Sequence, residues 1–185
     1  MTKSQAARRR RVMDSALELA SDGGFEAVQM RDVAASANVA LGTVYRYFSS
    51  KERLILETYV EQIEALRERL RARPPTGETP RDRVIEVLQR ACRFLQKYPE
   101  ATGAMVRAVG TAQPDEAEQV RRITVAMTSI ITSAIRVDEP TERDLAVARV
   151  LQLAWYSSLI GWVGGVDPAD RMLSDLAQAT ELLLP

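Results

Sequence analysis

Hydrophobic residues recur every three or four positions along most of the 185-residue chain, with polar residues between them. This spacing is the period of amphipathic α-helices that bury one face. Prolines fall between the periodic segments rather than within them. The pattern therefore predicts an all-α fold of about nine helices, which begin near Ala6, Met30, Leu41, Ser50, Pro80, Pro99, Pro114, Thr141 and Pro168.

Short local signals mark several of the expected helix ends. Gly23 and Gly24 follow the first periodic segment, where glycine commonly ends a helix. Thr141 and Asp144 have the spacing of a capping box, in which each side chain bonds the backbone N–H of the other residue. Asp167 and Pro168 are expected to cap the last helix.

The segment from Met30 to Lys51 predicts two short helices joined by a tight turn. Small residues on the first helix allow a close approach, and Asn38 suits the turn because asparagine tolerates left-handed backbone angles. Val44 and Phe48 point inward by their i, i+4 spacing. The residues left on the outer face of the second helix are Leu41, Gly42, Thr43, Tyr45, Arg46 and Tyr47.

This outer face has the chemistry of a DNA-reading surface. Tyrosine, threonine and arginine side chains donate hydrogen bonds to phosphates or base edges, with Arg46 a candidate guanine reader. Leu41 and Gly42 can approach a thymine methyl group or a phosphate closely. The alternative is that the aromatic residues form an ordinary core cluster with polar tips.

Charge is distributed in a way that fits nucleic acid at one end of the chain. Residues 1–55 carry nine Lys or Arg and six Asp or Glu, whereas the remainder carries 16 basic and 19 acidic residues. An unbroken run, Arg8 to Arg11, precedes the first amphipathic segment. Such a run suits phosphate contact, although a basic run by itself is more often a solvated tail.

Together the basic arm, the Gly-Gly-Phe turn and the motif GTVYRYFSSKERL closely resemble the TetR family of transcriptional repressors. The resemblance implies a DNA-binding domain over residues 1–55 and a helical ligand-binding and dimerisation domain over 56–185. It adds Arg31 and Lys51 to the expected DNA contacts, with Lys51 on a phosphate. Gln29 stands where this family usually has a Thr or Ser cap, so a weaker cap is expected there.

The predicted ligand-binding residues are large, apolar and partly flexible, which suits a bulky hydrophobic effector. About half of them are expected to be ordinary core, because periodic apolar stripes chiefly build structure. Within the family, residues 28–31, 42–43, 45–48 and 139–142 are similar to actinobacterial repressors of cholesterol catabolism. That resemblance implies a steroid-side-chain acyl-CoA effector, with phosphates near Arg90, Arg93, Arg107 or Arg121. The candidate lining is Phe94, Leu95, Met105, Met127, Ile131, Trp155, Leu159 and Trp162.

The last two predicted helices are apolar on more than one face, which indicates a partner. A homodimer built on a four-helix bundle is expected, and its two-fold axis would require an inverted-repeat operator in double-stranded DNA. The alternative is a monomer whose wide apolar faces are all internal. The candidate contacts are Ser157, Gly161, Gly165, Leu176, Thr180 and Leu183.

Some classes of chemistry lack their residues in this chain. It has no histidine and a single cysteine, Cys92, so histidine triads, zinc clusters and disulfides are not expected. We therefore expect no enzyme activity, no metal and no cofactor. No run of 18 apolar residues occurs, and we expect a cytoplasmic protein with no membrane partner.

The sequence thus predicts a dimeric, ligand-responsive transcriptional repressor. Two other classes stay open. An all-helical protein-interaction module would show no salt-dependent DNA affinity. A small helical enzyme acting on lipid thioesters would need an acid, base or nucleophile in its pocket.

Overall fold

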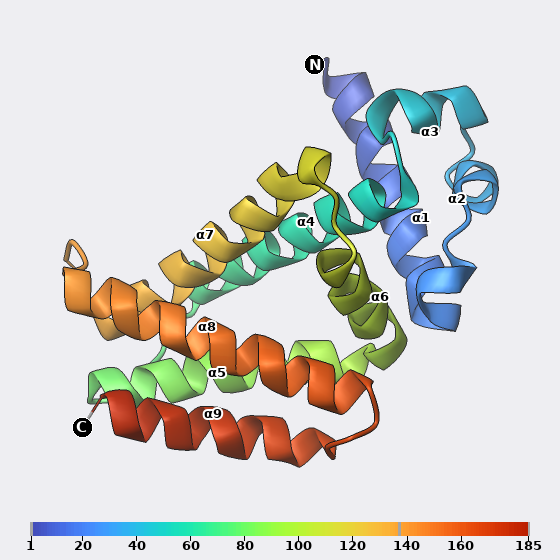
Figure 1. Ribbon diagram of the computed structural model, residues 1–185. Helices are drawn as coiled ribbons and strands as arrows, with labels where there is room; N and C mark the ends of the chain where they lie inside the picture. Colours follow the sequence, from blue (N-terminus) through green and yellow to red (C-terminus); the bar gives the residue numbers. More distant parts are fainter. Residues whose placement is uncertain (1, 137, 185) are drawn as a thin grey trace. The chain divides into compact units, whose positions relative to one another are not determined.

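A computed structural model describes residues 2–136 and 138–184 (Figure 1). The described chain is all-α, as predicted: it contains nine α-helices, one short 3₁₀ helix and no strand. The helices are α1 (Lys3–Ala27), α2 (Met30–Ser36), α3 (Leu41–Tyr47), α4 (Lys51–Ala72), α5 (Pro80–Lys97), α6 (Pro99–Gly110), η1 (Pro114–Glu116), α7 (Ala117–Ile135), α8 (Glu142–Val163) and α9 (Ala169–Leu183).

Most helix ends follow the local signals in the sequence. The backbone leaves helical angles at Gly23 and Gly24, where φ is −154° and +66°, so α1 kinks where its end is predicted. Gln29 makes no side-chain cap bond, which confirms the weak start of α2. Helix α1 begins before Ala6, because Thr2 and Gln5 form a capping box.

One expected cap is wrong. Asp167 does not cap α9, whose N-cap residue is Pro168 and has no side-chain hydrogen bond. Instead the backbone N–H of Asp167 donates to the carbonyl of Gly161 at 3.1 Å. A Cβ atom on Gly161 would lie 2.4 Å from Oδ2 of Asp167, so a larger residue there would displace the Asp167 carboxylate.

The described chain forms two compact units. Unit 1 contains the chain up to Gln62 and Tyr98–Arg121, and unit 2 contains Ile63–Lys97 and the chain from Arg122 onward. Helices α4 and α7 each contribute residues to both units. Helix α6 packs against α1 within unit 1. The division after residue 55 stays a prediction.

Unit 1 has a continuous hydrophobic core beneath the two short helices. Residues of α1, α2, α3 and α4 are almost completely buried there. The guanidinium of Arg9 lies 5.1 Å from the centroid of the Phe48 ring and bonds Glu57 at 2.7 Å. The largest side chains that are fully buried there are Phe48, Met13, Leu54, Leu56, Val12, Val28 and Val33.

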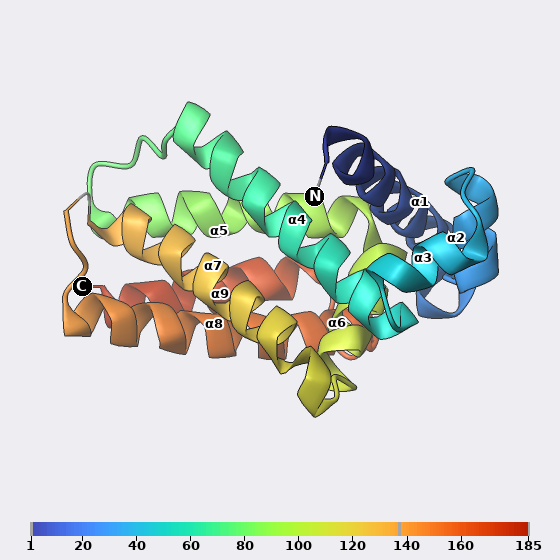
Figure 2. The same cartoon turned by 90° about the horizontal axis from the view of Figure 1, so that it is seen from above.

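Within unit 2, α9 packs against both α5 and α8, as Figures 1 and 2 show. Leu88, Leu151 and Leu176 are each about 1 % exposed or less and fill the space between these helices. Cys92 is fully buried in α5, and burial raises the pKa of its thiol to about 12. It therefore packs as a small hydrophobic residue, as the sequence predicts.

No helix among the described residues is both long enough and apolar enough to cross a membrane.

The start of α8 is held by a compact polar cluster. Oδ2 of Asp144 accepts hydrogen bonds from the Thr141 backbone, the Thr141 hydroxyl and Nε of Arg136, all within 2.9 Å. The backbone N–H of Asp144 donates back to the Thr141 hydroxyl, which confirms the predicted capping box. Arg136 and then the Thr141 donors lower the pKa of Asp144 from 3.8 to about 2.

This cluster makes stability depend on pH in a defined direction. Because the pKa of Asp144 is lower in the folded chain, its contribution is complete above pH 3.8 and is lost as the pH falls toward 2. We expect Asp144→Asn to lower the urea midpoint at pH 7. The difference from the parent should shrink between pH 4 and pH 2. Asp22→Asn, at an exposed position of α1, is the control; an Asp144 difference that stays constant with pH would contradict this account.

Candidate functional site

Helices α2 and α3 form the predicted helix-turn-helix. Asn38 has φ of +52° and is the only non-glycine residue with positive φ among those described. The backbone N–H of Val39 donates to the carbonyl of Ala34 at 3.0 Å, which closes the turn. Ala34 and Ala37 are buried at the crossing, where small side chains let the two helices approach.

The outer face of α3 is accessible as predicted for most of its residues. Leu41 and Tyr45 are 37 % and 51 % exposed, and Gly42 and Arg46 are also exposed. Thr43 is half-buried, while Val44 and Phe48 are buried beneath the face. A Cβ atom on Gly42 would meet no atom within 4 Å, so the backbone there is open to an approaching molecule.

Tyr47 lies deeper than the sequence suggests. It is half-buried, its ring packs edge-on against Phe48 at 6.3 Å, and Arg46 lies 5.4 Å from its centroid. The Tyr47 hydroxyl is buried and has no hydrogen-bond partner among the described residues. Tyr47 is therefore partly a core residue, and its hydroxyl is a hydrogen-bond donor that no described residue of unit 1 accepts.

Lys51 and Arg31 are in different environments. Arg31 is exposed on α2. Lys51 packs on the Phe25 ring, with Nζ 4.1 Å from its centroid, and donates to the Phe25 carbonyl at 3.3 Å. Arg107 of α6 lies 4.2 Å from the same ring and pairs with Glu26 at 2.8 Å. Lys51 and Arg107 thus hold α4 and α6 to the end of α1.

Part of the basic run near the N-terminus is also used inside unit 1. Arg9 bonds Glu57 and Glu61, and Nε of Arg11 donates to the Ala37 carbonyl at 3.5 Å. Arg10 stays 63 % exposed. The run is therefore not a solvated tail, and fewer of its arginines point to solvent than the sequence suggests.

The structure separates the eight predicted ligand-binding residues. Met105 belongs to unit 1, where it lines a small apolar void of about 10 Å³. In unit 2, Phe94 and Trp162 are half-buried. The five residues that are almost completely buried in unit 2 are Leu95, Met127, Ile131, Trp155 and Leu159.

Trp155 differs from the other buried residues in this set. Its side chain is 5 % exposed, yet the indole Nε1–H has no acceptor among the described residues. An unpaired buried donor costs about 1–3 kcal/mol, so pairing this N–H with an acceptor would be favourable.

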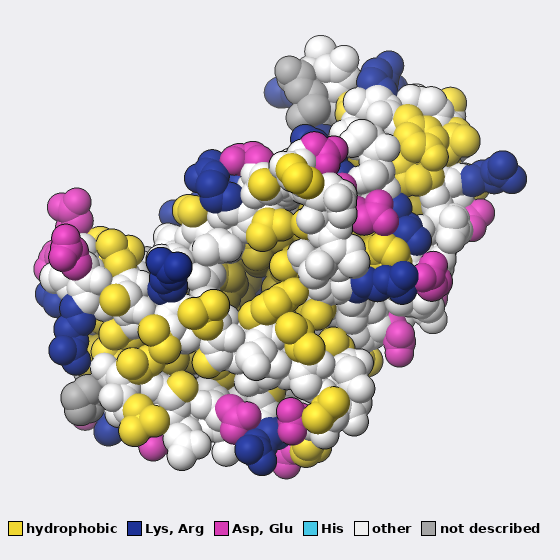
Figure 3. Space-filling view, viewed as in Figure 1, with side chains coloured by type: hydrophobic (Ala, Val, Ile, Leu, Met, Phe, Trp, Pro, Cys, Tyr) yellow, Lys and Arg dark blue, Asp and Glu magenta, His cyan; other side chains and the backbone are white. Residues whose placement is uncertain are grey.

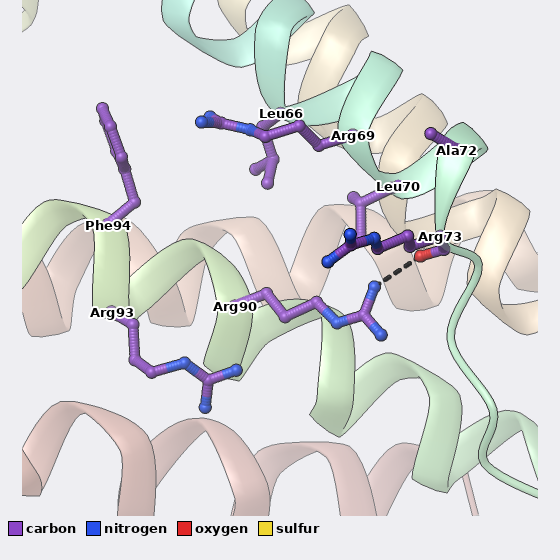
Figure 4. Close-up of a pocket in the computed structure, with 8 residues that line it drawn as sticks. All are labelled: Leu66, Arg69, Leu70, Ala72, Arg73, Arg90, Arg93 and Phe94. Carbon is purple, nitrogen blue, oxygen red and sulfur yellow. Dashed lines mark hydrogen bonds between the residues drawn. The ribbon is translucent and has the colours of Figure 1, made fainter.

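Arginines surround a cavity of about 580 Å³ between the C-terminal half of α4 and α5 (Figure 4). Arg69 and Arg73 come from α4 and the residue after it, and Arg90 and Arg93 come from α5. Arg90 pairs with Glu86 and donates to the Arg73 carbonyl. Phe94 rises from α5 toward Arg69, whose guanidinium is 5.3 Å from the ring centroid.

Only some of the residues that line this cavity are predicted from the sequence. Arg90, Arg93 and Phe94 are among the residues predicted to meet an effector, whereas Arg69 and Arg73 were missed. Their i, i+4 spacing puts them on one face of α4, but the sequence does not show that this face meets α5. The other two predicted phosphate contacts, Arg107 and Arg121, pair with Glu26 and Glu118.

The predicted dimer residues also fall into different environments. Leu176 and Thr180 are buried within one chain, so the structure moves them from a partner face to the core. Gly165 has φ of +72°, which is a local reason for glycine, and Gly161 lies against the Asp167 carboxylate. Leu183 is half-buried, and Ser157 is exposed on α8.

Helix α8 also has an exposed apolar stripe, which is not among the sequence predictions. Val150, Leu153 and Ile160 are 46 %, 66 % and 48 % exposed, and with Ser157 they follow helical spacing. Figure 3 shows hydrophobic side chains reaching the surface over this helix. The i, i+3, i+7, i+10 spacing was available in the sequence as a signal.

A tight-turned helix pair with an exposed polar second helix defines a DNA-binding regulator of the helix-turn-helix class. The family model for bacterial regulatory proteins of the tetR family matches residues 12–58, and the model for the tetracyclin repressor-like C-terminal domain matches residues 77–183. The chain belongs to the TetR family of transcriptional regulators, as its motif predicts.

Individual relatives agree with this assignment. The HTH-type transcriptional repressor KstR of Rhodococcus jostii is 39 % identical over 99 % of this chain and 85 % of its own length. The crystal structure of a TetR regulator from Rhodococcus sp. RHA1 has a TM-score of 0.89 and 35 % identity, over 98 % and 97 % of the two chains. FadR from Bacillus subtilis, solved in complex with stearoyl-CoA, shares the fold at a TM-score of 0.68 and 18 % identity, over 95 % and 97 %.

Gly42→Ala tests whether the open backbone of α3 meets DNA. Alanine is favoured over glycine in helices by roughly 0.5–1 kcal/mol, and the added Cβ meets nothing, so stability should rise. We expect operator affinity to fall at least about tenfold, because the methyl group would stand between the backbone and DNA. Thermal unfolding and fluorescence anisotropy on labelled operator DNA measure the two effects.

Gly103→Ala on α6 is the matched control, since a Cβ atom there also meets nothing within 4 Å. It should gain stability and keep the parent's operator affinity. Equal affinity for the two variants would show that DNA does not approach Gly42.

Proposed function

We propose that this protein is a dimeric repressor that binds an inverted-repeat operator and is released by an acyl-CoA effector. The exposed face of α3 carries the proposal. Gly42, Tyr45 and Arg46 are presented to solvent there above buried Val44 and Phe48, on a turn fixed by Asn38. A solvated surface would not need an open glycine beside an arginine and a half-exposed tyrosine, whereas major-groove reading uses all three.

The α8 stripe supports the homodimer. Val150, Leu153 and Ile160 leave an apolar strip exposed, and such a strip is costly unless a partner covers it. A two-fold axis would pair α8 with the same helix of a second copy, because an isologous contact uses one patch twice. Two α3 helices would then face successive major grooves on one side of the DNA.

An acyl-CoA effector is supported by the chemistry of unit 2 and by a relative. The buried apolar side chains suit an acyl chain or steroid side chain, and Trp155 offers an unpaired N–H to a carbonyl oxygen. FadR from Bacillus subtilis, which shares this fold, binds stearoyl-CoA. The similarity to cholesterol-catabolism repressors favours a steroid-side-chain thioester within this class.

Helix α4 provides the route from effector to operator in this proposal. Its first residues belong to unit 1, where Lys51 packs on Phe25, and its last residues belong to unit 2. An effector that prefers one placement of this helix shifts the population of the two heads away from the spacing that fits DNA.

The decisive experiment is operator release. The purified protein is bound to the intergenic DNA beside its own gene, titrated with salt, and then titrated with stearoyl-CoA and with a CoA thioester of a steroid side-chain acid. Affinity should fall steeply with salt, because each neutralised phosphate releases counterions. At least one thioester should release the DNA and be recovered intact. Salt-independent affinity, or no specific binding at low salt, would contradict the proposal.

Two variants separate the steps of this mechanism. Arg46→Ala should lose about tenfold to a hundredfold in operator affinity and still bind the thioester, seen as a change in the fluorescence of the two tryptophans, both in α8. Trp155→Phe keeps an aromatic ring and removes the Nε1–H. It should still bind the operator and need more thioester for release.

The dimer is tested by Leu153→Asp. A carboxylate in the exposed stripe leaves the core of one chain intact but would be desolvated in the partner contact. We expect sedimentation velocity to show a monomer and operator affinity to fall with it. Val125→Asp on α7, which is 54 % exposed, is the control and should remain a dimer. A dimeric Leu153→Asp protein would rule out this face.

A further inference from the structure

We propose that the cavity between α4 and α5 binds the polyphosphate and base of a nucleotide, with Arg69, Arg73 and Arg93 on the phosphates and Phe94 against the base. The inference rests on the proposed acyl-CoA response and assigns residues to the nucleotide end of that effector. The nucleotide end, and not only the acyl chain, would then determine which thioesters release the operator.

The charge of the cavity is the first argument. Four guanidinium groups line it, and no carboxylate does. Only Arg90 has an acidic partner, Glu86, whose carboxylate also accepts the backbone N–H of Thr76. Within the described residues, Arg69, Arg73 and Arg93 make no ion pair. The cavity therefore carries an uncompensated positive charge that a polyphosphate would neutralise.

The spacing of the arginines is the second argument. Arg69 and Arg73, the residue after α4, are four residues apart, and Arg90 and Arg93 of α5 are three apart, so each pair places like charges near one another. Like charges at this spacing repel one another. The dipole at the C-terminal end of α4 favours cations near Arg69 and Arg73, but it does not account for the pair on α5. A bound anion accounts for both pairs.

Arg90 differs from the other cavity arginines because two polar contacts hold its guanidinium in place. It donates to the Arg73 carbonyl at 2.5 Å, which is the dashed line in Figure 4, and it also pairs with Glu86. Its guanidinium is thus fixed and ties the segment after α4 to α5. The remaining arginines are exposed, and Arg69 lies against the Phe94 ring. In Figure 4, Arg93 extends on the side of α5 away from α4 and would have to turn.

Phe94 is the cavity residue that would bind the base of a nucleotide, which a simple anion lacks. Its ring is half-buried, stands between the helices near Arg69, and is already covered on one side by that guanidinium. A planar base can stack on an aromatic ring or an arginine plane. The volume, about 580 Å³, lies within the range of small-molecule sites.

The test compares stearoyl-CoA with the stearoyl thioester of pantetheine, which has the same acyl chain and thioester but no phosphate or base. The parent should be released from operator DNA by at least about tenfold less stearoyl-CoA than pantetheine thioester. In Arg69→Gln/Arg73→Gln, Arg93→Gln and Phe94→Leu proteins this preference should shrink, and it should vanish when the three arginine changes are combined.

Arg121→Gln is the control, because it removes one positive charge outside the cavity, where Arg121 pairs with Glu118. It should keep the parent's preference. Cavity variants that retain the full preference for stearoyl-CoA would overturn the assignment while leaving the proposed function standing.

Direct calorimetry with adenosine 3′,5′-bisphosphate and with inorganic phosphate tests the nucleotide site separately from the proposed release of the operator by an acyl-CoA. Binding of the bisphosphate to the parent that is lost in the arginine variants supports the nucleotide site, even if neither thioester releases DNA and the proposed function fails. Equal binding of inorganic phosphate and bisphosphate would overturn the role of Phe94, and no binding of either would overturn the site.

Discussion

Arg9 makes the contact on which the shape of unit 1 depends. Its guanidinium lies over the Phe48 ring, donates to Glu57 at 2.7 Å and approaches Glu61, so α1, the end of α3 and α4 meet at one side chain. Glu57 is buried and also accepts from Gln119 of α7 at 3.1 Å. Removing one partner of a buried pair leaves an unpaired charge, which costs more than the pair contributes. This polar contact therefore helps to hold the end of α3 against α1 and α4.

This arrangement explains which features the sequence could predict. The helical period identifies which residues face inward, and the special residues of turns identify themselves: Gly24, Asn38 and the Thr141–Asp144 box all lie where predicted. Long charged side chains are different, because their partners depend on packing between distant segments. Lys51 and Arg9 have the charge of phosphate contacts, yet each reaches back to a group of unit 1.

The environments of Leu176, Thr180 and the cavity arginines of unit 2 likewise depend on packing that the sequence does not show. Thr180 and Leu176 follow a helical stripe that suits a partner equally well, and only the packing of α9 on α5 and α8 shows that they are internal. Arg69 and Arg90 are 21 positions apart in the sequence and look like ordinary surface charges. They acquire a shared environment because the loop after α4 reverses the chain and brings α5 alongside.

Helix α8 is apolar on two opposite sides, and this limits how effector binding and dimer contact can change independently. Its inner side holds Leu151, Trp155 and Leu159, which are nearly fully buried, and its outer side holds Leu153 and Ile160, which are about half exposed or more. A helix that is apolar on both sides is stable only when both are covered. If a carbonyl pairs with the Trp155 indole from within and a second copy covers the outer stripe, one rigid helix lies between effector and partner. Any rotation of α8 that improves the contact with the effector must also change the contact with the second copy. Effector binding and dimer contact are then coupled through the position of this helix.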